Sequence, residues 1–167
     1  MIDDPALLAR AEALVAAYAA AGLTVATAES CTGGLVAGLL TAIPGSSAVV
    51  ERGFVTYSNA AKAECLGVPA DLIAAQGAVS MDVARAMAEG ALSHARANVA
   101  VAITGIAGPG GGSADKPVGL VHFGLAAKGA PVRHLERRYG DLGRTEIRRQ
   151  AVGDALGLLE SVLAPTS

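Results

Sequence analysis

The sequence predicts an α/β fold in which helices cover both faces of a mixed β-sheet. Helical and strand-like patterns alternate through the first two-thirds of the chain. Residues 99–104, VAVAIT, form a nearly continuous apolar run, which is typical of a strand buried on both faces. Two further strand-like segments, near 118–127 and 131–138, meet at Lys128-Gly129. A hairpin there would make the sheet mixed.

The other predicted elements are delimited by the residues at their ends. A helix over 5–21 has apolar residues at helical spacing and ends before Gly22. Asn59 is the expected cap of a short helix that contains Lys62, and Ser80 is the expected cap of a longer helix. The remaining elements are a strand at 24–28, a helix through about residue 40, a strand at 48–57 and an amphipathic helix at about 144–163.

Length and composition are those of one compact unit. The chain has 167 residues, so we expect a single domain over residues 1–167 with a substantial core. Hydrophobic residues make up 52% of the sequence and charged residues 17%, which is not a disordered composition. Because the apolar excess is mostly alanine, with 21 glycines beside it, we expect a core of small side chains.

The charge pattern predicts no nucleic-acid partner and no membrane partner. The formal net charge is −2 and aromatic residues make up 3%, whereas nucleic-acid binders need a basic face or stacking side chains. Arginines between 133 and 149 form the one local basic cluster, which we interpret as a solvated strand and helix face. No apolar run is long enough to span a bilayer.

The cysteine and motif content predicts a cytoplasmic protein without metal or cofactor. Cys31 and Cys65 make no disulfide framework, and the start MIDDPALLAR lacks the basic region of a signal peptide. Reduced thiols in the cytoplasm are therefore expected. No set of His, Cys and carboxylate residues has metal-ligand spacing, and neither a dinucleotide fingerprint nor a P-loop is present.

A predicted strand-to-helix junction at TAESCTGG, residues 27–34, is the first segment suited to chemistry. Free backbone amides at a helix start favour an anion, and glycine lets a ligand approach the backbone. A phosphate or a developing oxyanion would fit there. Alternatively, Ser30 or Thr32 simply caps the helix. Cys31 is interpreted as a buried structural thiol rather than a nucleophile, since no histidine is close in the sequence.

Hydroxyl, phenol and amine groups flank the next predicted strand. Ser46 and Ser47 precede it, Tyr57 is its last residue and Lys62 follows it. A serine nucleophile needs a base, and a lysine serves if it is neutral when the hydroxyl attacks. Burial would lower the pKa of the lysine and so favour the neutral amine that can act as a base. The alternative is that the lysine is a surface residue and that both serines are turn residues.

A glycine-rich loop follows the apolar strand at 99–104. It reads TGIAGPGGGS from Thr104 to Ser113. Because open α/β sheets bind ligands beyond the carboxyl ends of strands, Thr104 is the informative residue. The loop fails the dinucleotide fingerprint, since Ser113 stands where a third Gly or Ala belongs. A surface loop without a ligand is the alternative.

Taken together, these segments resemble the CinA C-terminal domain family, the nicotinamide-nucleotide amidases. The resemblance covers about residues 5–163 and rests on several long motifs in a fixed order. It implies a three-layer α/β/α sandwich with a mixed, mostly parallel sheet. The matching stretches are AESCTGG at 28–34, PGSSAVVERGFVTYSNAAK at 44–62, GAVS at 77–80, ITGIAGPGGGS at 103–113, KPVGLV at 116–121 and the region around Arg144.

The resemblance also implies an activity and roles for single residues. The family hydrolyses the carboxamide of nicotinamide mononucleotide to nicotinate mononucleotide and ammonia, in pyridine nucleotide salvage. By motif, Ser47 becomes the nucleophile, Lys62 its base and Tyr57 a group that positions or relays the proton. Backbone amides near 30–34 or 46–48 would stabilise the oxyanion. The residues that the resemblance assigns to substrate binding are Ser30, Cys31, Thr32, Gly33, Thr104, Gly105 and Arg144.

Alternatives remain for both the roles and the function. Ser30 is the second candidate for the nucleophile, and Arg148 is the second candidate, after Arg144, for an arginine that binds the substrate phosphate. The rival functions are a non-catalytic nucleotide-binding or sensing module and an amidase that acts on another small amide. A homo-oligomer, dimer or larger, is also expected.

Overall fold

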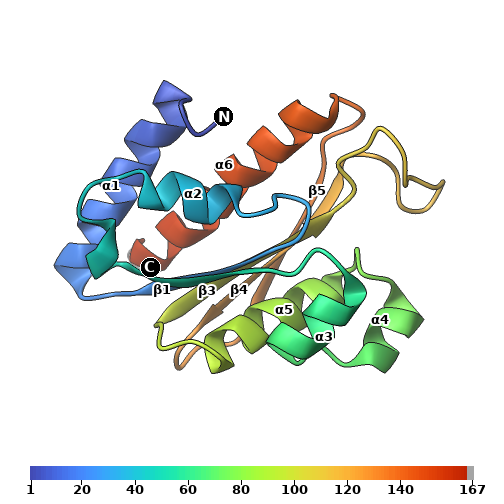
Figure 1. Ribbon diagram of the computed structural model, residues 1–167, viewed down its shortest axis with the longest axis horizontal. Coiled ribbons are helices and arrows are strands. Elements are labelled where there is room, and N and C mark those ends of the chain that lie inside the picture. The colour runs from blue at the N-terminus through green and yellow to red at the C-terminus, as the bar shows by residue number, and fades with distance from the viewer. Residues whose placement is uncertain (165–167) are drawn as a thin grey trace.

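A computed structural model describes residues 1–164 and contains one five-stranded sheet (Figure 1). In chain order its strands are β1 (Val25–Glu29), β2 (Val50–Val55), β3 (Val99–Gly105), β4 (Leu120–Ala127) and β5 (Arg133–Arg138). Their order across the sheet is β2-β1-β3-β4-β5. β1 pairs in parallel with β2 and β3, whereas β4 is antiparallel to β3 and β5. Only β4 opposes the other strands, so the prediction of a mixed, mostly parallel sheet is confirmed.

The helices form one layer on each face of the sheet, as Figure 1 shows. On one face lie α1 (Pro5–Ala21), α2 (Leu35–Thr41) and α6 (Arg144–Leu163). On the other lie α3 (Asn59–Leu66), α4 (Ala70–Gln76) and α5 (Met81–Ser93). The three-layer α/β/α architecture expected from the family resemblance is therefore present.

The cores on the two faces of the sheet differ in the size of their side chains. Between the sheet and α1, α2 and α6 the buried side chains are large, and include Tyr18, Leu39 and Phe123. Between the sheet and α5 the strand side chains are mostly alanines. Close packing follows there: a Cβ atom at Gly124 of β4 would overlap the carbonyl oxygen of Ala84 in α5. The expected core of small side chains thus describes the α5 face of the sheet.

The element ends follow the expected capping chemistry, with one difference. Gly22 ends α1 in the left-handed region, and the side chain of Ser80 caps α5. The cap of α3 is Ser58 rather than Asn59, because its hydroxyl accepts a hydrogen bond from the amide of Ala61 at 3.0 Å. The short helix α4 was not predicted, because its seven residues make too few turns to show a periodic pattern.

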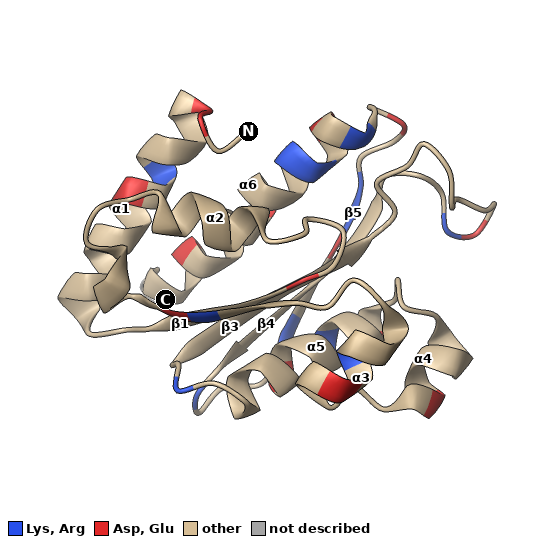
Figure 2. Ribbon diagram, in the orientation of Figure 1, with Lys and Arg blue, Asp and Glu red and all other residues tan. Residues whose placement is uncertain are grey.

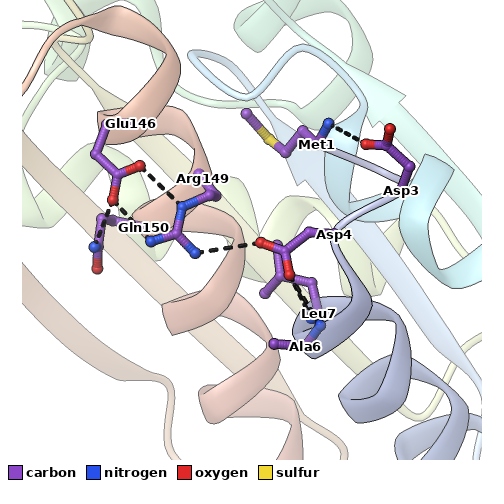
Figure 3. Close-up of polar contacts among 8 residues, drawn as sticks. All are labelled: Met1, Asp3, Asp4, Ala6, Leu7, Glu146, Arg149 and Gln150. Atoms are coloured by element: carbon purple, nitrogen blue, oxygen red, sulfur yellow. Dashed lines mark hydrogen bonds and ion pairs between the residues drawn. The ribbon is translucent and has the colours of Figure 1, made fainter.

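Charged residues lie mainly on the outer faces, and Figure 2 shows basic residues along β5 and the first turns of α6. The arginines of β5 are exposed, as expected for a solvated strand face. Figure 3 shows how Arg149 of α6 joins Glu146 to Asp4 at the start of α1. Among residues 1–164, no helix combines the length and apolarity that a membrane crossing needs.

Candidate active site

The carboxyl ends of β1, β2 and β3 meet at one edge of the sheet, and a cavity of about 240 Å³ opens there. Such an edge is the usual ligand site of open α/β sheets. Its walls come from the turn after β1, the segment after β2, the loop after β3 and the start of α6. The lining residues are Ser30, Cys31, Tyr57, Gly105, Ile106, Ala107, Gly108, Gly110, Gly111 and Arg144.

Ser30 and Lys62 form a hydrogen-bonded pair at this cavity. The Nζ atom of Lys62 lies 3.0 Å from the Oγ atom of Ser30, and the Lys62 side chain is buried. The parallel pairing of β1 with β2 brings them together, because Ser30 directly follows β1 and Lys62 lies in the first turns of the helix after β2. The amide of Ser30 also donates to the carbonyl of Ile103 in β3 at 2.9 Å, which fixes its backbone.

The burial of Lys62 disfavours its charged form. Burial lowers the pKa of this amine below its ordinary value of 10.5. None of the ion pairs within residues 1–164 includes Lys62. Its Nζ atom lies 2.9 Å from the carbonyl oxygen of Thr56 and 3.5 Å from that of Tyr57. Nζ is the donor in all three contacts, so its oxygen partners match the three N–H groups of an ammonium. In the neutral amine that catalysis requires, two N–H groups serve the carbonyls and the lone pair faces the hydroxyl of Ser30.

The turn after Ser30 is held at both ends. The buried carboxylate of Glu29 accepts hydrogen bonds from the amides of Val36 at 2.9 Å and Ala37 at 3.1 Å, and so caps α2. The helix begins at Leu35, directly after the Gly-Gly pair, because residues 31–34 form the turn. From α6, Arg148 donates to backbone carbonyls of this turn.

Cys31 lines the cavity with a buried side chain, as the interpretation of a structural thiol requires. Burial raises the pKa of its thiol to about 12, and the charge of Arg148 only partly offsets this. The thiolate is the nucleophilic form of cysteine. Cys31 is thus protonated at neutral pH and contributes shape to the cavity.

Arg144 closes the cavity by joining two of its walls. Its guanidinium donates to the carbonyl of Gly108 at 2.8 Å and to the hydroxyl of Tyr57 at 2.9 Å. The hydroxyl of Tyr57 therefore faces the arginine, and only the backbone carbonyl of Tyr57 approaches Lys62. Arg148, the alternative to Arg144, is not among the lining residues.

Ser47 lies away from this site. It is exposed in the 3-10 helix Ser46–Ala48, which precedes β2, whereas Lys62 follows that strand. The six residues of β2 separate the two ends by roughly 20 Å at about 3.3 Å per residue. The structure therefore does not bring the expected nucleophile to its expected base. Ser47 and Lys62 are close in the sequence, but β2 lies between them, and the two ends of a strand lie at opposite edges of the sheet.

Of the other residues expected to bind substrate, some line the cavity and others are buried beneath its surface. Gly105 and the glycine loop after it form a wall of the cavity. Thr104 is buried, and its hydroxyl donates to the carbonyl of Ala78 at 2.9 Å. Thr32 is buried too, and its hydroxyl has no hydrogen-bond partner among the described residues. The larger part of this wall is the segment from Ile106 to Gly111. Its glycine-rich sequence indicated a loop, but its residues were not predicted individually as site residues.

No group of three or more His, Cys, Asp or Glu side chains within residues 1–164 is placed to hold a metal ion. The polar side chains that line the cavity include the hydroxyl of Ser30, the phenol of Tyr57 and the guanidinium of Arg144, and the buried amine of Lys62 contacts Ser30 from behind the lining. This set offers a nucleophile with an adjacent base and a fixed positive charge.

Comparisons of the sequence with known proteins agree with one another. The family model of the CinA C-terminal domain matches residues 8–163. The nicotinamide-nucleotide amidohydrolase PncC of Escherichia coli K12 is 53% identical over 159 residues, which cover 95% of each chain. A CinA-like protein of Anaeromyxobacter sp. strain K is 54% identical over 152 residues, which cover 91% of this chain and 37% of that protein. The chain thus spans little more than a third of such longer relatives.

Solved structures share both fold and sequence with the chain. The competence/damage inducible protein CihA of Agrobacterium tumefaciens superposes with a TM-score of 0.93 at 56% identity, covering 95% of this chain and 96% of that one. A CinA superfamily protein of Klebsiella pneumoniae 700603 gives 0.88 at 34% identity, with coverage of 94% and 97%. These matches extend over nearly all of the described residues.

Proposed function

The chain belongs to the CinA C-terminal domain family, and on this premise we propose that it hydrolyses the carboxamide of nicotinamide mononucleotide, giving nicotinate mononucleotide and ammonia. The observation that carries the proposal is the buried Ser30–Lys62 pair at the cavity. Amide hydrolysis needs a nucleophile with a base beside it, and this pair supplies both. The name of the PncC relative indicates the nicotinamide nucleotide as substrate. The reaction would serve pyridine nucleotide salvage.

In the proposed mechanism, the Oγ atom of Ser30 attacks the carboxamide carbon while the neutral amine of Lys62 takes the hydroxyl proton. The carbonyl oxygen becomes an oxyanion, and the lysine becomes an ammonium. When the tetrahedral intermediate collapses, the C–N bond breaks and Lys62 returns its proton to the departing nitrogen, which leaves as ammonia. A water molecule then attacks the ester on Ser30, with Lys62 again acting as base, and releases nicotinate mononucleotide.

Ser30 replaces Ser47 as the nucleophile in this proposal, for reasons of distance and exposure. Ser30 lies within hydrogen-bond reach of a buried lysine and lines the cavity. Ser47 is exposed beyond the far end of β2. The segment with Ser47 precedes β2. Tyr57 and Lys62 follow that strand, at its other end, where the site lies.

Arg144 is the proposed partner of the substrate phosphate. It lines the cavity, and a planar guanidinium binds phosphate through two parallel hydrogen bonds. Its contacts with Gly108 and Tyr57 fix the side chain at the rim. Tyr57 is then a residue that orients Arg144, rather than a relay for the proton of Ser30.

Ammonia release from a panel of amides tests this proposal. The panel contains nicotinamide mononucleotide, nicotinamide riboside, nicotinamide, and aliphatic amides such as glutamine. We expect turnover of the mononucleotide at a kcat/KM well above that of every other compound. Preferential turnover of a different amide would assign the site another substrate. Tight binding of the mononucleotide without ammonia release would instead indicate a nucleotide-binding module.

A further inference from the structure

We propose that Arg148 is a positioning residue that orients the backbone amide of Thr32 as an oxyanion donor for the reaction at Ser30. The inference rests on the amidase function proposed above. It starts from an arginine whose hydrogen bonds go to the backbone of the nucleophile's own turn. Its Nε atom donates to the carbonyl of Cys31 at 3.1 Å, and one terminal nitrogen lies 3.4 Å from the carbonyl oxygen of Thr32.

The turn after β1 leaves one backbone amide, that of Thr32, without a partner among the described residues. The carbonyl of Ser30 accepts a hydrogen bond from the amide of Gly33 at 3.0 Å, which closes a β-turn over residues 30–33. Within residues 1–164, the amide of Thr32 makes no hydrogen bond. Thr32 is the second residue after the proposed nucleophile; its side chain is buried, and Cys31, between the two, lines the cavity.

Peptide geometry links Arg148 to this amide. The C=O and N–H groups of a planar trans peptide point in opposite directions. Because Arg148 binds the carbonyl of Cys31, the N–H of Thr32 in the same peptide points away from α6. The peptide between Cys31 and Thr32 is the central peptide of the β-turn. Type I and type II turns differ by a rotation of this peptide. Arg148 therefore holds the orientation that leaves the Thr32 amide free.

The arginine is placed for this role by its helix. Arg144 and Arg148 are four residues apart in α6 and so share one face of it. One reaches the cavity wall and the other reaches the turn. Arg149, the next residue, points to a different set of partners and pairs with Glu146 and Asp4 (Figure 3). The charge of Arg148 is thus directed at the turn, where it also polarises the peptide that would donate to the oxyanion.

Ammonia release by Arg148→Met and Arg148→Lys tests the proposal, with Arg149→Met as the matched control. An oxyanion donor acts in the transition state and not in the ground state. For Arg148→Met we expect kcat to fall by on the order of 10²-fold while KM for nicotinamide mononucleotide changes less than about threefold. Arg148→Lys, whose single amine cannot bind both carbonyls in the same way, should lie between wild type and Arg148→Met. Arg149→Met should keep the wild-type kcat.

A second readout separates oxyanion stabilisation from general damage to the fold. An analogue with an aldehyde in place of the carboxamide forms a tetrahedral adduct with a serine, whereas nicotinate mononucleotide binds as a planar product. Arg148→Met should lose affinity for the aldehyde in proportion to its loss of kcat/KM, and should keep its affinity for the product. If Arg148→Met does not fold, Arg148→Lys decides by the same comparison.

The outcomes for the two proposals are distinct. If the wild type turns over the mononucleotide and the Arg148 variants keep kcat within about twofold, the positioning role is overturned and the amidase function stands. Equal losses of affinity for the aldehyde and for the product would also overturn the positioning role, because they indicate a distorted cavity. A wild type that releases no ammonia from the mononucleotide would overturn the proposed function itself.

Discussion

The Nζ atom of Lys62 lies 3.0 Å from the Oγ atom of Ser30, although the two residues are 32 positions apart in the chain. The contact depends on the parallel pairing of β1 with β2, which ends both strands at the same edge of the sheet. It depends also on burial, which disfavours the ammonium form of Lys62. A nucleophile and a base are therefore joined by the fold itself, and the predictions below follow from this contact and its neighbours.

Replacing each serine in turn separates the two candidates for the nucleophile. Ser30→Ala removes the only atom placed to accept the acyl group in this account, so we expect kcat to fall by at least about 10³-fold. Ser47→Ala changes an exposed residue outside the cavity, and its kcat should stay within about twofold of wild type. Ammonia release at saturating nicotinamide mononucleotide measures both. The reverse order of effects would return the role to Ser47.

The pH profile of the reaction should report the neutral form of Lys62. Since the base must be unprotonated, kcat/KM should rise with pH, and it should level off below pH 10.5 because burial lowers the pKa of this amine. Lys62→Ala should lose about 10²–10⁴-fold in kcat. A small primary amine added to Lys62→Ala should restore part of the rate. Added amine that has no effect, with an unchanged pH profile in the variant, would show that another group is the base.

Removal of the guanidinium at position 144 should act on substrate binding. A charge-assisted hydrogen bond is worth about 1.5–3 kcal/mol, so Arg144→Ala should raise KM for nicotinamide mononucleotide about 10–150-fold. For nicotinamide riboside, which lacks the phosphate, the same variant should change KM little. Tyr57→Phe, which removes the hydroxyl that contacts Arg144, should show a smaller rise of the same kind. Equal effects on both substrates would mean that Arg144 shapes the cavity and does not bind phosphate.

The buried lysine should also give the fold a characteristic pH dependence. Because the pKa of Lys62 is lower in the folded state, the unfolded state binds more protons between that pKa and 10.5. The free energy of unfolding contributed by this group therefore rises with pH across that window. Lys62→Met lacks the titrating amine, so the difference in unfolding free energy between wild type and variant should move in favour of the wild type as pH rises. Urea unfolding at several pH values measures it, and a difference independent of pH would contradict a lowered pKa.

Much of the fold could be predicted from local chemistry. The helix over 5–21 was predictable because apolar spacing and Gly22 both mark it, and the apolar run at 99–104 identified the central strand β3. Residues 70–76 were missed because a helix of two turns between Pro69 and Gly77 shows no clear period. The cap of α3 shifted by one residue, from Asn59 to Ser58, since both side chains suit that position.

The site was harder to predict because its contacts are long-range. Lys62 and the turn at 30–34 were both identified from their residue types, but no local pattern indicates that they meet. The family resemblance pointed to Ser47, which lies in the short 3-10 helix that leads into β2. Only the sheet topology shows that this end of β2 lies opposite the site. Likewise, the choice between Arg144 and Arg148 required the position of α6, which gives the two residues different partners.

The most direct test of the account locates the acyl group on the enzyme. Wild-type protein is mixed with excess nicotinamide mononucleotide, quenched in acid within the first turnovers and digested. Trypsin cleaves after Arg10 and Arg52 and leaves Ser30, Ser46 and Ser47 in one peptide, so tandem mass spectrometry must locate the modified serine. We predict a nicotinate mononucleotide ester on Ser30. An ester on Ser47, with Ser30 unmodified, would contradict it.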